Sequence, residues 1–306
     1  MNTDSELLIV DDMSPAAENI CTVTLRSASQ RRLPSWRPGA HIDLELPNWI
    51  TRQYSLCGDP NDQHSYRIGV RLEELSRGGS EYIHRLLRPG TLLKVRGPRS
   101  TFPDRTPAGT VFIAGGIGIT AVLAMFLRDH AQGLRPMLLY AGRSRAAMPF
   151  LDELPEDAEV VIAAKDEDQR LDFADLAARL PAGTAIAVCG PSRMVSAVEE
   201  AFPEEKFQVH AERFRAEPRA FVNTEFLTAC ARSGMEVTVG EHESLMGALA
   251  RADRPLAAGC REGVCGSCEV RVLSGEPEHR DLIGAPPGKM YPCVSRSSSE
   301  RLVLDL

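Results

Sequence analysis

The chain has 306 residues, of which 43% are hydrophobic and 25% are charged, and it carries a net charge of −7. This length predicts two or three domains of ordinary globular composition. The acidic balance argues against the clustered basic surface that binding to nucleic acid requires. No stretch approaches the roughly 20 apolar residues that span a bilayer, and the N-terminus lacks the basic region of a signal peptide. We therefore expect a cytoplasmic protein with no membrane partner.

Residues 1–106 are expected to form an all-β domain. Runs of alternating hydrophobic and polar residues are separated by turns that contain Pro and Gly, a pattern typical of a small antiparallel barrel or sandwich. The runs with the clearest alternation cover residues 20–25, 41–46 and 66–72.

Two short motifs in this segment have the composition of a phosphate-binding site. The first, Arg52-Gln-Tyr54-Ser55, places a cation, an aromatic ring and a hydroxyl at the end of a predicted strand. The second, Arg77-Gly-Gly-Ser80, precedes a helical run at 81–87. Unpaired N–H groups and the helix dipole favour an anion at such a helix start. The same residues also make an ordinary helix cap.

Residues 107–222 alternate predicted strands with predicted helices. This alternation indicates an α/β domain in which helices cover both faces of a parallel sheet. Strands are expected at 111–114, 136–140, 160–164 and 185–189, and helices at 120–130, 172–180 and 192–202.

Two loops of this segment follow a strand and open a helix. The run from Gly115 to Thr120, Gly-Gly-Ile-Gly-Ile-Thr, stands where a dinucleotide loop is required, although it is not the strict G-x-G-x-x-G pattern. The run from Cys189 to Met194 occupies the same position after a later strand. The Cys189 thiol could lie beside a nicotinamide ring, or it could be a small buried hydrophobe.

Residues 223–306 carry four of the eight cysteines in an informative pattern. Cys260, Cys265 and Cys268 follow a C-x₄-C-x₂-C spacing, and Cys293 comes later in the chain. This is the plant-type spacing of a [2Fe–2S] cluster. The glycines between these cysteines let the backbone turn tightly and direct its amides at the sulfurs.

A zinc site or a set of unrelated buried thiols is the alternative. Zinc ligands usually come as two close pairs or together with His, whereas these cysteines are grouped three and one, with no His inside the loop. The ligand types therefore favour iron and sulfur. Around the loop, strands are expected at 235–239, 269–273 and 301–304, and a short helix at 244–250.

In their order along the chain, these motifs resemble the phthalate dioxygenase reductase family, whose members carry FMN and a C-terminal plant-type ferredoxin domain and serve Rieske-type oxygenases. The resemblance covers nearly the whole chain. It implies an antiparallel β-barrel flavin domain at 1–106, an α/β parallel-sheet nucleotide domain at 107–222 and an α+β ferredoxin domain of the β-grasp type at 223–306. The implied activity is that of an NAD(P)H-dependent oxidoreductase.

The resemblance also implies roles for single residues. Those at the FMN phosphate would be Arg52, Gly78, Gly79 and Ser80. Those along the flavin ring would be Tyr54, Ser55, Val70 and Arg71, with Ser55 near N5. Those at the nicotinamide or pyrophosphate would be Gly116, Gly118 and Thr120, with Cys189 close to the nicotinamide. Phe214 would close over the flavin, and plain core packing is the alternative for this ring. The cluster ligands would be Cys260, Cys265, Cys268 and Cys293.

The resemblance implies NADH as the electron donor. Arg143 and Arg145 follow the second strand of the nucleotide segment, where cations can meet a 2′-phosphate, so NADPH is kept as the less favoured donor. The expected partner is a terminal oxygenase. The sequence does not separate this acceptor from a cytochrome P450, and a non-catalytic flavin and iron–sulfur redox sensor is the alternative from another class.

Overall fold

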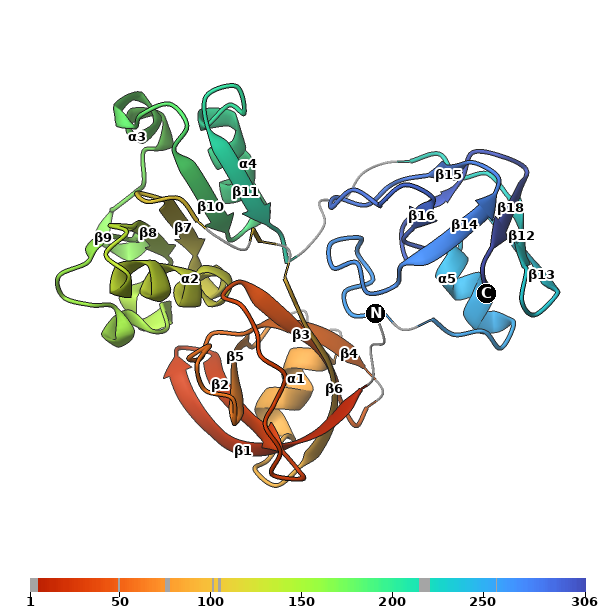
Figure 1. Cartoon of the computed structure of the whole chain (residues 1–306), viewed down its shortest axis with the longest axis horizontal. Coiled ribbons are helices and arrows are strands. Elements are labelled where there is room, and N and C mark those ends of the chain that lie inside the picture. The colour runs from red at the N-terminus through yellow and green to blue at the C-terminus, as the bar shows by residue number, and fades with distance from the viewer. Residues whose placement is uncertain are drawn as a thin grey trace. The chain divides into compact units, whose positions relative to one another are not determined.

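A computed structural model describes residues 5–48, 50–74, 78–100, 102–103, 106–214, 221–256 and 258–306. The chain divides into two compact units, Met1–Phe214 and Arg215–Leu306 (Figure 1). None of the helices in the described part of the chain combines the length and the apolar character needed to cross a membrane.

The boundary expected between residues 222 and 223 remains a prediction. Part of the predicted boundary, 215–220, lies outside the described residues. Phe221 and Val222, however, contact the second unit: the guanidinium of Arg280 lies 4.4 Å from the centre of the Phe221 ring and donates to the carbonyl of Val222 at 3.2 Å. The division of the first unit into two domains remains a prediction.

The first sheet of unit one is antiparallel and has the order β4-β3-β6-β1-β2-β5. An antiparallel bridge between Leu56 and Ile68 joins its two edges, so the sheet closes into a barrel. Its elements are β1 (Glu6–Ala17), β2 (Ile20–Ser27), β3 (Ala40–Glu45), β4 (Thr51–Ser55), β5 (Ser65–Arg71), α1 (Gly79–Arg85) and β6 (Leu92–Ser100).

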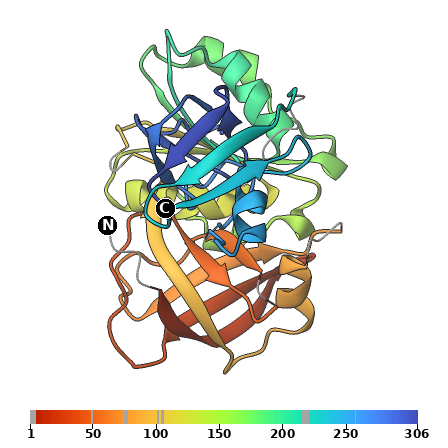
Figure 2. The same cartoon turned by 90° about the vertical axis from the view of Figure 1, so that its right-hand side faces the viewer.

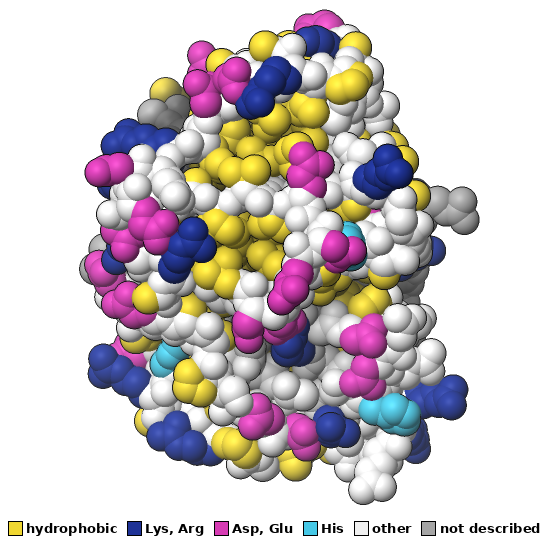
Figure 3. Space-filling model, turned by 90° about the vertical axis from the view of Figure 1, so that its left-hand side faces the viewer, with side chains coloured by type: hydrophobic (Ala, Val, Ile, Leu, Met, Phe, Trp, Pro, Cys, Tyr) yellow, Lys and Arg dark blue, Asp and Glu magenta, His cyan; other side chains and the backbone are white. Residues whose placement is uncertain are grey.

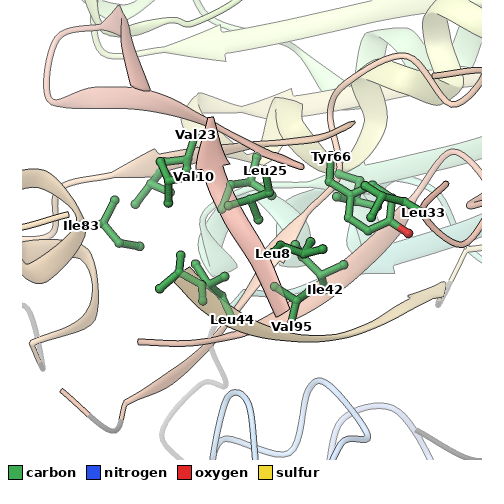
Figure 4. Packing of buried hydrophobic residues seen from close by; sticks show 14 of the residues in the cluster. Leu8, Val10, Val23, Leu25, Leu33, Ile42, Leu44, Tyr66, Ile83 and Val95 are labelled. Atoms are coloured by element: carbon green, nitrogen blue, oxygen red, sulfur yellow. The ribbon is translucent and has the colours of Figure 1, made fainter. Parts of the chain in front are cut away.

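Alternate residues of these strands point into the barrel and form its core (Figure 4). Ile83 of α1 is fully buried in the same core, so this helix packs against the barrel. Each fully buried aliphatic side chain stabilises the fold by about 1.5–3 kcal/mol. The labelled core residues include Leu8, Val10, Val23, Leu25, Ile42, Leu44 and Val95.

The second sheet of unit one is parallel, with the order β11-β10-β7-β8-β9. Helices join the strands as predicted, and the last strand, β11, was not predicted. Its strands are β7 (Val111–Gly115), β8 (Met137–Gly142), β9 (Glu159–Ala164), β10 (Ala185–Cys189) and β11 (Gln208–Glu212). The α-helices are α2 (Ile119–Ala131), α3 (Phe173–Arg179) and α4 (Ser192–Ala201), and four short 3₁₀ turns lie at Gly116–Gly118, Arg145–Ala147, Leu151–Glu153 and Lys165–Glu167.

Contacts from β5 join the barrel to the parallel sheet. Arg67 donates to both carboxylate oxygens of Glu153, at 2.8 and 2.7 Å, and its guanidinium lies 5.1 Å from the ring centre of Phe150. Next to this ion pair, the Cγ2 methyl of Thr120 lies so close to Gly69 that a Cβ there would stand 2.8 Å away. These contacts hold the start of α2 against the barrel.

The second unit is a mixed sheet with one helix on its face (Figure 2). Strand order is β13-β12-β18-β14-β16, and β12 runs parallel to β18. The core lies between the sheet and α5, whose N-cap Ser244 accepts the N–H of Gly247 at 3.0 Å. The elements are β12 (Phe226–Cys230), β13 (Met235–Val239), α5 (Leu245–Arg251), β14 (Val270–Ser274), β15 (Pro277–Glu278), β16 (Lys289–Met290), β17 (Arg296–Ser297) and β18 (Arg301–Leu304).

Candidate functional site

The structure brings the two predicted phosphate-binding motifs together. Gly78, with φ of +85°, turns the chain into α1. A Cβ on the following Gly79 would lie 2.8 Å from Cγ of Arg52, so the stem of this arginine rests on the backbone of the turn. The hydroxyl of Ser80 accepts the N–H of Glu73 at 3.1 Å. A cation beside a glycine turn at a helix start fits a phosphate group. Arg77 lies outside the described residues.

The residues predicted along the flavin ring differ in their exposure. Ser55 ends β4 and is buried, while burial raises the pKa of the Tyr54 phenol above its usual value. The side chain of Val70 is only 1% exposed and belongs to the barrel core, and its carbonyl oxygen lies 2.9 Å from Nε2 of His84. Arg71 is exposed and pairs with Glu73 at 2.6 Å.

The two predicted nucleotide loops pack directly on each other. A Cβ on Gly118 would lie 2.3 Å from the carbonyl oxygen of Cys189, and one on Gly115 would lie 2.6 Å from Cδ of Pro191. Gly116 has φ of +53°, a conformation that favours glycine. Because β7 and β10 are neighbours, the chain can approach itself this closely only where side chains are absent.

Thr120 has a structural role at this loop. It is 2% exposed, and its hydroxyl donates to the carbonyl of Ile117 at 2.9 Å. Its methyl group lies against Gly69, as described above. The side chain therefore supports the loop from behind.

A pocket of about 560 Å³ lies at the carboxyl ends of the parallel strands. This edge of a parallel sheet is where α/β proteins bind ligands. Figure 3 shows a face of unit one on which hydrophobic side chains gather in a hollow, with charged side chains around it. The residues that line the pocket include Arg71, Gly115, Gly116, Gly142, Arg143, Lys165, Arg170, Phe173, Pro191, Arg193 and Met194.

Glu212 was not predicted from the sequence, yet it lies beside Cys189. The two residues are register partners on β10 and β11. Burial raises the pKa of the Glu212 carboxyl to about 8, and its Oε2 has no hydrogen-bond partner among the described residues. Burial and then Glu212 raise the pKa of Cys189, so this thiol is neutral at physiological pH. Phe214, which follows β11, is 38% exposed and so does not pack as a core residue.

The cysteine loop of the second unit is built on glycines in left-handed conformations. Gly263 and Gly266 both have φ of +71°. A Cβ on Gly263 would lie 2.6 Å from Cγ2 of Val294, so this turn has no room for a side chain. The N–H of Glu262 donates to Sγ of Cys260 at 3.3 Å. Backbone amides therefore point at sulfur, as the sequence predicts.

The four predicted ligand cysteines lie in two interacting pairs. A hydrogen bond from Cys260 holds the pKa of Cys265 below its usual value, and one from Cys293 does the same for Cys268. In the described part of the chain no three His, Cys, Asp or Glu side chains are arranged to hold a single metal ion, and none of the four cysteines forms a disulfide. Two pairs of thiolates fit a two-iron cluster, in which each iron takes two.

Comparison with known proteins agrees with this geometry. Residues 229–296 match the 2Fe-2S iron-sulfur cluster binding domain family. The chain is 38% identical to phenoxybenzoate dioxygenase subunit beta of Ectopseudomonas oleovorans, over 95% of this chain and 94% of that relative. It is 33% identical to the 3-chlorobenzoate-3,4-dioxygenase reductase subunit of Comamonas testosteroni, over 99% of this chain and 98% of the relative. The solved structure of phthalate dioxygenase reductase matches with a TM-score of 0.74 and 31% identity, over 99% of this chain and 98% of that chain.

The chain belongs to the phthalate dioxygenase reductase family. This reductase accordingly has the predicted multidomain fold, with an antiparallel-sheet part, a parallel-sheet part and a ferredoxin part, and it is an oxidoreductase of the NAD(P)H-dependent kind. It is also similar to part of an intact type IV self-sufficient cytochrome P450 monooxygenase, with a TM-score of 0.86 and 38% identity over 99% of this chain and 41% of that chain.

Proposed function

We propose that this reductase takes electrons from a reduced nicotinamide dinucleotide, passes them through FMN to a [2Fe–2S] cluster, and delivers them to a separate terminal oxygenase in the cytoplasm. The observation that carries the proposal is the pairing of the four cysteines in the second unit. The first unit of the same chain contains both nucleotide loops and the turn at which Arg52 contacts Gly79. Relatives over nearly the full length are named as reductase subunits of dioxygenases or monooxygenases, which supports the partner.

The residues of the first unit would hold and orient the two nucleotides. Arg52 and the turn at 78–80 would hold the FMN phosphate, and Ser55 at the end of β4 would face the ring. Gly116 leaves the backbone open for the dinucleotide, whereas Gly118 lets the two loops pack together. The neutral thiol of Cys189 would lie toward the nicotinamide end.

The second unit would supply the last step of the electron path. Bound flavin would supply the change from a two-electron hydride donor to a one-electron acceptor. The paired cysteines would hold the acceptor, and the exposed ring of Phe214 would cover the flavin at the end of β11. No acid or base is needed for hydride transfer, and we assign none.

An anaerobic titration with NADH and with NADPH, followed by visible absorbance, tests the proposal. Both the yellow flavin and the red-brown cluster should bleach, with two electrons stored on the flavin and one on the cluster. Cys265→Ser should lose the cluster bands while the flavin is still reduced. Purified protein without flavin bands would rule out the electron path, and flavin that either nucleotide reduces only very slowly would favour a redox sensor.

A cytochrome P450 is the second candidate acceptor. It is favoured by the likeness to the self-sufficient P450 monooxygenase, in which the matching part is joined to the rest of a longer chain. The two acceptors are separated by mixing the reduced protein with a Rieske-type oxygenase or with a bacterial P450 under carbon monoxide. Rapid oxidation by only one of them identifies the class of partner.

A further inference from the structure

The cations of the dinucleotide pocket are concentrated in a protein that is acidic overall. Its net charge is −7, yet no Asp or Glu is among the described residues that line the pocket, whereas five cations are. Arg71 is paired with Glu73. The other four have no ion pair or side-chain hydrogen bond among the described residues: Arg143, Lys165, Arg170 and Arg193.

The position of these cations along the sheet edge assigns them to one end of the ligand. The pocket crosses the ends of β10, β7, β8 and β9, a span of three strand spacings, or about 14 Å. In the proposed function the nicotinamide lies at the β10 end of the pocket, next to the strand that carries Cys189. The adenosine half of the dinucleotide then lies over β8 and β9, where Arg143, Lys165 and Arg170 stand.

The loops that carry these three cations are tied together. The N–H of Asp166 donates to the carbonyl of Arg143 at 3.1 Å, which joins the loop after β8 to the loop after β9. Arg145 and Glu167 form a second link between the same loops, at 2.8 Å. Arg145 is thereby neutralised and does not line the pocket, whereas Arg143 does. The structure thus distinguishes Arg143 from Arg145, although the sequence made both of them candidates for contact with a 2′-phosphate.

We propose that this pocket binds a dinucleotide with a phosphate on its adenosine ribose, so that NADPH and not NADH is the preferred electron donor. The inference rests on the proposed reductase function and deepens it. Sites for NAD place a carboxylate after the second strand to accept the ribose 2′-hydroxyl, whereas an arginine there accommodates a 2′-phosphate. In this chain that position is Arg143, and Lys165 and Arg170 bring two further positive charges to the same end.

Binding of adenosine 2′,5′-bisphosphate and of 5′-AMP to the flavin-loaded protein tests the pocket directly, because the probes differ only in the 2′-phosphate. Charge-assisted hydrogen bonds should make the bisphosphate bind on the order of tenfold more tightly by calorimetry. The specificity constant kcat/KM for flavin reduction should favour NADPH to a similar degree. Equal affinity for the two probes would overturn the proposal.

Single substitutions then locate the phosphate. Lys165→Ala, Arg170→Ala and Arg143→Ala should each lower kcat/KM for NADPH by about fivefold or more and leave that for NADH within about twofold. Arg145→Ala is the matched control and should change neither. Variants that lower kcat/KM for NADPH and for NADH by the same factor would overturn the assignment. If neither donor reduces the flavin, the reductase function fails, while the two adenosine probes still decide which ribose the pocket prefers.

Discussion

Gly118 and the carbonyl oxygen of Cys189 approach each other so closely that a Cβ on the glycine would lie 2.3 Å from that oxygen. Both partners are backbone at the ends of neighbouring strands, so neither yields easily. The φ of Gly118, −59°, would itself accept alanine. Gly118→Ala should therefore act through the clash alone, and we expect it to push the two nucleotide loops apart. Because small misplacements of reacting groups slow a reaction strongly, the rate of flavin reduction should fall at least about tenfold in stopped-flow experiments.

Gly240→Ala provides the control for this substitution. Its Cβ would meet nothing closer than the Oε1 of Glu243, at 3.7 Å, and it lies in the second unit. This variant should reduce its flavin at the unaltered rate. A Gly118→Ala protein that does so as well would show that the contact between the loops does not matter for hydride transfer.

The contact between Arg52 and Gly79 predicts how FMN is held. Gly79→Ala would push the arginine side chain away from the turn, because Cγ and Nε of Arg52 stand 2.8 and 2.9 Å from the new Cβ. A side chain can move, so we expect the protein to fold and the flavin to bind about tenfold more weakly through loss of a charge-assisted contact. Fluorescence titration of the stripped protein with FMN measures this. Arg85→Ala, which removes a cation 69% exposed on the same helix, should leave the affinity unchanged.

Local patterns predicted most of the fold, and two of the strands that were not predicted, β1 and β11, show where such patterns fail. β1 contains two register shifts, between Val10 and Asp12 and between Pro15 and Ala17, which break the alternation of buried and exposed residues. β11 is an edge strand with no fully buried residue, so Gln208–Glu212 lacks a hydrophobic period. Both strands are specified by their neighbours in the sheet.

The candidate site divides in the same way. The cysteine spacing, the glycine loops and the Arg52 motif are local, and the sequence alone identified them. Glu212 lies beside Cys189 only because β11 pairs with β10, and Lys165 and Arg143 line the same pocket only because β9 pairs with β8. Strand order is a property of the whole domain, so no spacing along the chain could have shown these contacts.

We expect His41 to make the stability of the barrel depend on pH. It is 2% exposed, its two ring nitrogens lack partners among the described residues, and burial followed by Arg99 lowers its pKa from 6.5 to about 3. Between these pH values the unfolded chain binds a proton that the folded chain does not. The free energy of unfolding should therefore fall as the pH drops below 6.5, by about 1.4 kcal/mol per pH unit from this residue.

Urea unfolding between about pH 5 and pH 7 measures that slope. His41→Leu should flatten it by about one bound proton, because the variant has nothing to protonate at this position. His64→Leu, on an exposed turn, should keep the slope of the parent protein. If the His41 variant retained the full slope, the acid sensitivity would have to come from other groups.

Glu212 should act in the opposite direction, because burial raises its pKa from 4.5 to about 8. The folded chain holds this proton more tightly than the unfolded chain, so the stability that it contributes is complete below pH 4.5 and is lost as the pH rises toward about 8. Glu212→Gln keeps the shape and removes the ionisation. We expect the variant to match the parent near pH 4.5 and to become the more stable of the two, by about 1–3 kcal/mol, near pH 8. Urea unfolding of variant and parent across this pH range measures the difference. Glu200→Gln, on the exposed side of α4, is the control, and its free energy of unfolding should follow that of the parent at every pH. If the difference in free energy of unfolding between Glu212→Gln and the parent did not change with pH, the carboxyl would already be ionised in the folded protein.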